Sequence, residues 1–189
     1  VAFGECTSMT SVLLPDSLTQ IGDAAFLRCS SLTSVVLPDS LTQLGMEAFQ
    51  KCTSLTSMLL PDSLTQLGKK AFGQCSSLTS VVLPDSLTQL GDGTFALCIS
   101  LTSIVLPDSL TQVGDNVFAE CTSLASVVLP DSAVLGDYVF YECNALVQKA
   151  ALAGFDTVEL YLRDRYMRIT LRKLVLRLLR KYNQAVNNA

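Results

Sequence analysis

The prolines of this chain recur at a fixed interval, and this regularity constrains the fold more than any other feature. Pro15 and Pro38 are 23 residues apart (38 − 15), and the same interval separates every further neighbouring pair. Cysteines and phenylalanines keep this period until the last copy, where Cys143 and Phe140 come one residue early. A constant period within the range of roughly 20–29 residues predicts one supersecondary unit stacked many times, whose core lies between neighbouring copies. The recurring residues are Pro15, Pro38, Pro61, Pro84, Pro107 and Pro130; Cys6, Cys29, Cys52, Cys75, Cys98, Cys121 and Cys143; and Phe3, Phe26, Phe49, Phe72, Phe95, Phe118 and Phe140.

The first half of one copy, LTSVVLPDS, predicts a short strand and a turn. Residues 80–83 are mostly β-forming and lie between turn residues. Side chains alternate along a strand, so Val81 and Leu83 should point into the core, whereas Ser80 and Val82 should point outward. Pro84 has no amide donor and should end the strand, and the following Asp and Ser should bond nearby backbone amides in the turn.

The second half, LTQLGDGTFALC, predicts a second extended piece and an irregular arc. Leu87 and Leu90 should point inward, and Gly91 should turn the corner because glycine has no Cβ. The arc should place Phe95 and Cys98 in the core. Differences between copies concentrate in this arc, which favours a solvent-facing segment that drifts, with a patterned binding face as the alternative.

These motifs resemble the BspA-like leucine-rich repeat family, whose pattern LxxIxLP, LxxIG and AFxxC is matched almost residue for residue from Val1 to about Val147. The resemblance implies a right-handed solenoid with one strand per turn on its inner face, members that act as surface adhesins or host-contact proteins, and no catalytic residues. The expected fold is a leucine-rich repeat solenoid of short parallel strands, about six to seven turns, followed by a C-terminal α-helical tail. The expected domains are residues 1–148, an N-terminally truncated solenoid that opens in mid-repeat, and residues 149–189, a basic amphipathic tail.

The two parts of the chain carry opposite charge. Up to residue 148 there are four basic and fourteen acidic residues (4 − 14 = −10), and from residue 149 onward nine basic and three acidic (9 − 3 = +6). This asymmetry predicts that the tail is a second interaction surface. No stretch is long and apolar enough to predict a membrane span.

The cysteines occur once per turn, which predicts a ladder of buried thiols behaving as small hydrophobic groups. Stacked turns lie close enough for disulfides, which remain the alternative. The chain has no histidine and no CxxC pair, which argues against a metal site. A thiol ladder favours an intracellular, reducing compartment over the cell surface.

Stacking predicts three ladders on the solenoid surface, and the third, formed by Thr19, Gln20 and their equivalents, is a polar outer strand without reactive chemistry. The outward aliphatic ladder is either an interface or only a consequence of β-propensity. The aspartates of the Pro-Asp-Ser turns resemble the carboxylate pair of a retaining glycosidase or a calcium site, but their identical environments argue for a structural role in the turn. The aliphatic ladder consists of Leu13, Val36, Leu59, Val82, Val105 and Val128, and the acidic ladder of Asp16, Asp39, Asp62, Asp85, Asp108 and Asp131.

The tail predicts two helices. Residues 144–153 favour a helix that Gly154 ends. Asp156 and Glu159 predict a capping box, with Phe155 and Leu160 as its hydrophobic staple, at the start of a helix running to about residue 186. One apolar face, which includes Leu160, should cover the open end of the solenoid, and a second face should remain available together with the basic residues. The candidate tail interface is Arg163, Arg168, Arg172, Arg177, Arg180 and Lys181 with Leu162, Ile169 and Leu176.

These features argue against an enzyme, because serine and cysteine nucleophiles lack a histidine base and no phosphate-binding loop is present. We therefore expect a non-catalytic protein–protein interaction scaffold without a cofactor, whose repeated strand face binds a protein and whose basic tail docks a partner or caps the solenoid. The alternatives are a cell-surface adhesin of the BspA type and a peripheral subunit of a larger, membrane-associated assembly. An anionic surface could attract the tail, whereas no nucleic-acid-reading motif is present.

Overall fold

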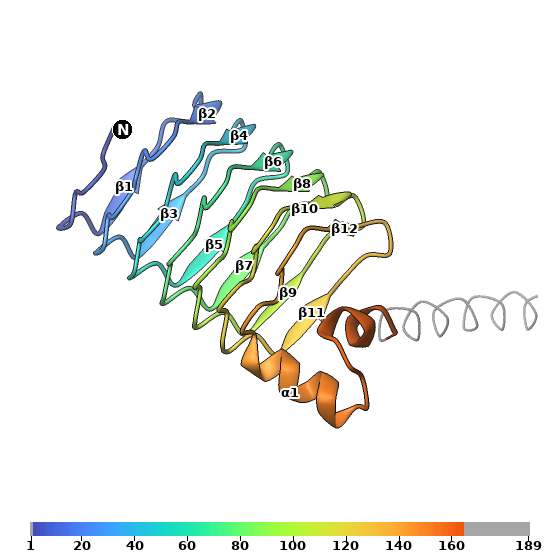
Figure 1. Cartoon of the computed structure of the whole chain (residues 1–189). Coiled ribbons are helices and arrows are strands. Elements are labelled where there is room, and N and C mark those ends of the chain that lie inside the picture. Colours follow the sequence, from blue (N-terminus) through green and yellow to red (C-terminus); the bar gives the residue numbers. More distant parts are fainter. Residues whose placement is uncertain (1, 165–189) are drawn as a thin grey trace, which may run out of the picture.

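Each turn of the molecule contains two short strands, and each strand pairs in parallel with its equivalent in a neighbouring turn (Figure 1). The computed structural model describes residues 2–164. Strands of three residues carry the Ser-Val-Val motif, and strands of two residues carry the Gln-Leu motif. The longer strands are β1 (Ser11–Leu13), β3 (Ser34–Val36), β5 (Ser57–Leu59), β7 (Ser80–Val82), β9 (Ser103–Val105) and β11 (Ser126–Val128). The shorter ones are β2 (Gln20–Ile21), β4 (Gln43–Leu44), β6 (Gln66–Leu67), β8 (Gln89–Leu90), β10 (Gln112–Val113) and β12 (Val134–Leu135).

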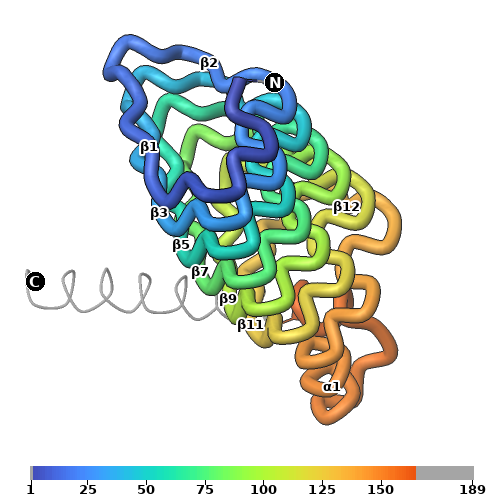
Figure 2. Tube along the Cα trace, turned by 90° about the vertical axis from the view of Figure 1, so that its left-hand side faces the viewer, coloured from blue at the N-terminus to red at the C-terminus, as the bar shows by residue number. Residues whose placement is uncertain are grey.

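Each strand lies beside the equivalent strand of the next turn, so that the turns stack as a regular coil (Figure 2). The short strands make one continuous parallel sheet in the order β12-β10-β8-β6-β4-β2, and the longer strands pair as β1-β3, β5-β7 and β9-β11. Equivalent positions of neighbouring repeats face each other, as in the pairing of Ser57 with Ser80. The last pair joins Gln112 to Val134, a spacing of 22 (134 − 112), because the final copy is one residue short. The predicted solenoid of short parallel strands is confirmed.

The core is a column of identical layers. Phe3, Phe26, Phe49, Phe72, Phe95, Phe118 and Phe140 stack with ring centroids 5.0–5.8 Å apart and planes within 11° of parallel. Inward leucines surround this column, and Leu78, Leu87 and Leu101 are fully buried. Offset stacking of rings adds about 0.5–1.5 kcal/mol per pair beyond the burial of their apolar area. The inward direction predicted for Val81, Leu83, Leu87, Leu90 and Phe95 is confirmed.

Each buried cysteine forms a hydrogen bond with the backbone of the preceding turn. The Cys75 Sγ donates to the Phe49 carbonyl oxygen at 3.2 Å, and the Cys98 Sγ donates to the Phe72 oxygen at the same distance. A thiol is small enough to pack as a hydrophobic group and still offers one weak donor. Every cysteine of the described chain is a free thiol, and only Cys6 is exposed. The period-breaking Cys143 keeps the same bond, to the Phe118 oxygen at 3.0 Å.

The turns differ from the sequence prediction in one feature, the partner of the serine, and explain the glycine at the corner. The Pro-Asp-Ser serine bonds the preceding turn, not its own: the Ser86 hydroxyl donates to the Leu64 carbonyl oxygen at 2.7 Å. Gly91 does not have a left-handed backbone, since Gly93 and Gly154 are the only glycines with positive φ in the described chain. A Cβ on Gly91 would lie 2.7 Å from the Lys69 nitrogen, so close approach of neighbouring turns requires glycine there.

Two helical segments cover the C-terminal end of the solenoid (Figure 1). Helix α1 (Asn144–Leu152) buries Leu146 and Ala150, and the Lys149 ammonium donates to the Ala125 carbonyl oxygen at 2.8 Å. Residues 158–164 are helical as well. The predicted helix at residues 144–153 is confirmed, and the boundary expected at residue 148 falls within α1. The part of the second helix predicted beyond residue 164 lies outside the described residues.

The start of the second helix corrects a prediction. Thr157, and not Asp156, is the capping residue, because its Oγ1 accepts the Leu160 amide at 3.2 Å. Phe155 packs against Tyr161 with ring centroids 5.8 Å apart, whereas Leu160 is exposed. No helix within residues 2–164 is long and apolar enough to cross a membrane.

Candidate interaction surface

The outward face of the longer strands carries a continuous row of exposed aliphatic side chains. Leu13 is 92% exposed, Val36 77%, Leu59 69%, Val82 59% and Val105 63%. Val128, beside the helical end, is half-buried. These six residues, which we call the strand ladder, point outward because each lies directly between two inward side chains and successive side chains of a strand alternate between its faces. Large exposed apolar residues rarely form such a row on a protein that does not bind a partner there.

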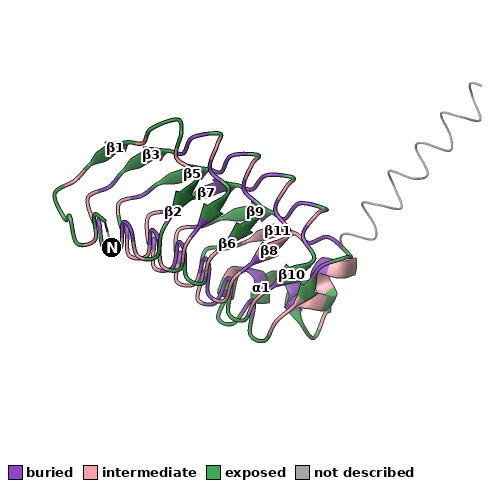
Figure 3. Cartoon of the chain, turned by 90° about the horizontal axis from the view of Figure 1, so that it is seen from above, coloured by how far each residue is buried: buried purple, intermediate pink, exposed green. Residues whose placement is uncertain are grey.

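Serines lie along one side of the strand ladder, and the longer strands β3, β5 and β7 are largely exposed (Figure 3). Ser80 and Ser103 are exposed beside it, and a groove of about 310 Å³ lies between β7 and β9. Val82, Val105 and Pro107 line the groove, and Asp85 lies at its end. The surface is therefore a flat apolar stripe with hydroxyl groups along one side, and it offers aliphatic packing and a few hydrogen bonds but no reactive group.

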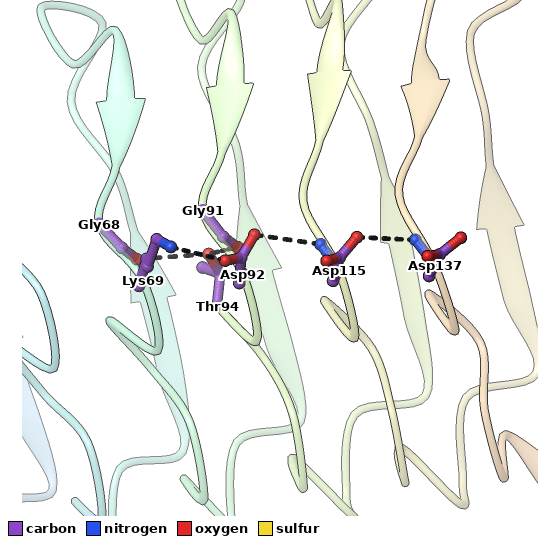
Figure 4. A network of polar contacts seen from close by, with 7 residues as sticks. All are labelled: Gly68, Lys69, Gly91, Asp92, Thr94, Asp115 and Asp137. Carbon is purple, nitrogen blue, oxygen red and sulfur yellow. Dashed lines mark hydrogen bonds and ion pairs between the residues drawn. The ribbon is translucent and has the colours of Figure 1, made fainter.

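The corners after β6, β8 and β10 are polar, and their aspartates have a role that the sequence did not indicate (Figure 4). The Asp92 carboxylate accepts the Asp115 amide at 3.2 Å, and the Asp115 carboxylate accepts the Asp137 amide at 2.8 Å. Lys69 pairs with Asp92 at 2.8 Å, and this bond lowers the Asp92 pKa below its usual value. Buried Thr94 donates to the Gly91 carbonyl oxygen at 2.6 Å. The aspartates that bridge turns are thus those of the variable arc.

The aspartates of the Pro-Asp-Ser turns are exposed in every copy. The serine next to the aspartate, and not the aspartate itself, makes the repeated bond between turns, as at Ser63, Ser86 and Ser109. Within the described chain, no group of three or more histidine, cysteine, aspartate or glutamate side chains is arranged to hold a metal ion. These aspartates form an acidic border of the solenoid.

The buried thiols are poor nucleophiles. Burial raises the pKa of Cys52 and of Cys143 to about 12, with a smaller contribution at Cys52 from the neighbouring Cys29. Burial also raises the pKa of Cys75 and Cys98 well above the ordinary thiol value. Since the thiolate is the reactive form, these cysteines are structural.

The candidate tail residues divide into two groups. Leu162 is 1% exposed and packs in the core, so the expectation that it remains available to a partner is wrong. Its stripe, with Val158, covers the solenoid end, whereas the face with Leu160 is turned outward. The Arg163 guanidinium donates to the Ala133 carbonyl oxygen at 3.3 Å and so contacts the last turn. The other candidates lie outside the described residues: Arg168, Arg172, Arg177, Arg180, Lys181, Ile169 and Leu176.

An aromatic pair near the helical end was missed from the sequence. Tyr138 is 70% and Tyr141 51% exposed, and their rings meet edge to face with centroids 6.2 Å apart. A cleft of about 400 Å³ separates this pair from α1 and Phe155. The available signal was the replacement of small or polar residues by tyrosine at two positions of the last arc.

Comparisons with known proteins agree with this architecture. A family model described as "BspA type Leucine rich repeat region" matches residues 1–125 in six copies. The chain is similar to a leucine-rich repeat protein from Bacteroides ovatus, with 38% identity over 75% of this chain and a TM-score of 0.72. It spans 37% of that protein. It is also similar to a T. pallidum leucine-rich repeat protein, with 35% identity over 82% of this chain and 75% of the other and a TM-score of 0.75.

A more distant structure shares the fold alone. The pneumococcal vaccine antigen PcpA has 24% identity over 65% of this chain and 31% of its own, with a TM-score of 0.56. The comparison with curated proteins found no significant match.

Proposed function

Because the chain belongs to the BspA-type leucine-rich repeat family, we propose that it is a non-catalytic protein-interaction module that binds a partner protein through its strand ladder. The exposed aliphatic row carries this proposal. Five consecutive turns each present one large aliphatic side chain that is more than half exposed. Complete burial of a fully exposed side chain of this type is worth about 1.5–3 kcal/mol. A protein partner that covers the ladder gains the share of this free energy that corresponds to the exposed area, less the cost of association.

The geometry favours a protein partner over a small ligand. Small molecules bind in enclosed pockets, which bury most of their surface. The strand ladder instead runs along five turns with only shallow grooves, one of them being the groove of about 310 Å³ between β7 and β9. A surface of this shape suits an extended, complementary protein face.

The basic segment after residue 164 is the second part of the proposal. Its predicted contacts are Arg168, Arg172, Arg177, Arg180 and Lys181. The start of the second helix, directly before this segment, covers the solenoid end through Leu162 and contacts the last turn through Arg163. We propose that the basic residues that follow dock an acidic surface of the partner, since opposite charges steer association and fix orientation.

Position-specific photocrosslinking tests the strand ladder. A benzophenone amino acid replaces Leu59, Val82 or Val105 in the native cell, and Gln43, Gln89 or Gln112 on the short strands in the matched controls. The proposal predicts one adduct of the same mass from all three ladder positions and none from the controls. Adducts of equal yield from both sets of positions, or none from the ladder, would overturn it.

Competition then checks that the crosslinked protein binds the strand ladder. Unlabelled protein with Val82→Asp and Val105→Asp should fail to compete for adduct formation, whereas unlabelled protein with Gln89→Asp and Gln112→Asp should compete fully. Equal competition by the two variants would show that the crosslinked protein does not bind the ladder.

A further inference from the structure

A second surface lies on the arcs of the solenoid, and the binding proposed for the strand ladder does not use it. A groove of about 450 Å³ crosses consecutive turns at the corner where each arc leads into the next strand. Its walls come from the two residues that flank each core cysteine. The residues before the cysteine are Arg28, Lys51, Gln74 and Leu97, and among those after it are Ser76 and Ile99.

The chemistry of this groove changes in one direction along the stack. The repeated residues scarcely vary between copies, but the position before the cysteine runs from two cations through an amide to an aliphatic group. In the other described turns the same position is a glutamate, as in Glu5 and Glu120. After the cysteine, Ile99 replaces the serine or threonine that neighbouring turns carry, and it is 44% exposed. One end of the groove is therefore cationic and the other apolar.

Folding alone does not favour this series of side chains, because the backbone at each of these positions has a left-handed conformation. Arg28, Lys51, Gln74 and Leu97 all have φ between 59° and 61°, in the left-handed region. That conformation costs a residue with a Cβ roughly 1–2 kcal/mol relative to the right-handed one, and glycine avoids most of the cost. A bulky aliphatic residue such as Leu97 is unusual there. The fixed backbone conformation also gives successive side chains the same orientation, so their order along the stack is their order in the groove.

The cationic end is suited to a carboxylate. The solenoid up to residue 148 has a net charge of −10 (4 − 14), so most of its surface repels a carboxylate. The Arg28 guanidinium already holds one carboxylate, that of Glu5, at 2.9 Å. Lys51, one turn along, is half-buried, and its ammonium group has no ion-pair partner within residues 2–164.

The spacing between the two ends fits a peptide. The rings of Phe49 and Phe72 are 5.5 Å apart, as are those of Phe72 and Phe95, so the turns of Lys51 and Leu97 are about 11 Å apart (5.5 + 5.5). An extended chain rises about 3.1–3.4 Å per residue. Three or four residues therefore span the distance from the ammonium group to the apolar end.

We propose that this groove binds an extended acidic protein segment, whose aspartate or glutamate pairs with Lys51 and whose aliphatic side chain, three or four residues away, packs on Leu97 and Ile99. Charge complementarity selects the segment, and the apolar end sets its register. The groove shares no lining residue with the strand ladder, so the proposal stands independently of the interaction that the ladder makes.

Fluorescence anisotropy with defined peptides tests the proposal. The probe is a fluorescein-labelled octapeptide, Gly-Glu-Glu-Pro-Ser-Leu-Leu-Gly, and the comparison peptides replace both glutamates by lysine or both leucines by serine. We expect measurable binding of the first peptide alone, weakening as salt is raised because ion pairs are screened. Absence of binding at millimolar protein, or equal binding of the three peptides, would overturn the proposal.

Matched variants locate the binding. Lys51→Glu should weaken binding at least tenfold, whereas Lys70→Glu makes the same charge change at an exposed, left-handed position of the neighbouring arc and should change it less than twofold. Leu97→Gly removes the apolar end while relieving backbone strain, so the variant stays folded. It should also weaken binding at least tenfold, and Glu120→Gly is its control. Equal effects of each variant and its control would contradict the assignment.

Discussion

The stacked phenylalanines should carry a measurable share of the stability, and the Phe72→Leu substitution isolates it. Phe72 is fully buried and stacks on Phe49 and on Phe95, with 5.5 Å between ring centroids on each side and planes within 5° of parallel. Leucine keeps an aliphatic side chain in the core but removes both ring pairs. Phe3, at the first turn, has one ring partner and is 43% exposed. The Phe3→Leu substitution is therefore the matched control.

The expected magnitudes follow from the ring pairs that each substitution removes. Two ring pairs at about 0.5–1.5 kcal/mol each give about 1–3 kcal/mol at Phe72. The imperfect fit of leucine adds about 1 kcal/mol in a close-packed layer. One partly hydrated pair gives about 1 kcal/mol or less at Phe3.

Equilibrium unfolding in urea, followed by circular dichroism, measures both substitutions. We expect the free energy of unfolding to fall two to four times as much for Phe72→Leu as for Phe3→Leu. Equal losses at the two positions, or a loss below about 0.5 kcal/mol at Phe72, would refute the view that the ring stack is a main source of stability.

Three further results are expected from single measurements. Cys6 should react with a thiol reagent in the native protein at pH 7.5, and the six buried cysteines only after unfolding, as counted by mass spectrometry. Stability should fall as pH rises above about 9, because the unfolded thiols then ionise while burial keeps the folded ones protonated; each buried thiol contributes up to about 1.4 kcal/mol per pH unit, and a flat profile between pH 8 and 10.5 would contradict the buried ladder. Gly93→Ala should destabilise by about 1 kcal/mol, because Gly93 has a φ of +60°, whereas Gly73→Ala, without a positive φ, should cost less than half as much in urea unfolding.

The sequence predicts the solenoid well because each position repeats in a fixed environment. Alternation alone assigns Val81 to the core and Val82 to the surface, and both assignments agree with the structure. The period likewise places Phe95 and Cys98 inside. Such predictions succeed where a residue depends on its immediate neighbours and on an identical copy of itself one turn away.

The predictions that failed depend on contacts that no local pattern contains. The Ser86 hydroxyl reaches the Leu64 carbonyl oxygen, 22 residues earlier, and not its own turn. Asp156 and Thr157 are both good capping residues, and only the path of the chain between the two helical segments selects Thr157. The second helix is apolar on two sides, and the prediction chose the side of Leu160, whereas the side of Leu162 covers the solenoid.

The binding roles of the two surfaces remain predictions, because these side chains face solvent and not an equivalent side chain of the next turn. The strand ladder is exposed as its alternation requires, but exposure follows from the fold whether or not a partner exists. The graded groove between Lys51 and Leu97 is visible only once the arcs are stacked, because its members are separated by one full repeat each in the sequence.

The affinity of the crosslinked partner for two double variants tests the central claim most directly. Val82→Asp with Val105→Asp places two carboxylates in the strand ladder, and Gln89→Asp with Gln112→Asp places two on the short strands of the same turns. With the fold of both checked by circular dichroism, titration calorimetry should show binding at least tenfold weaker for the ladder variant, and within twofold of the unmodified protein for the other. Unchanged affinity for the ladder variant would contradict the claim that this protein binds its partner through the strand ladder.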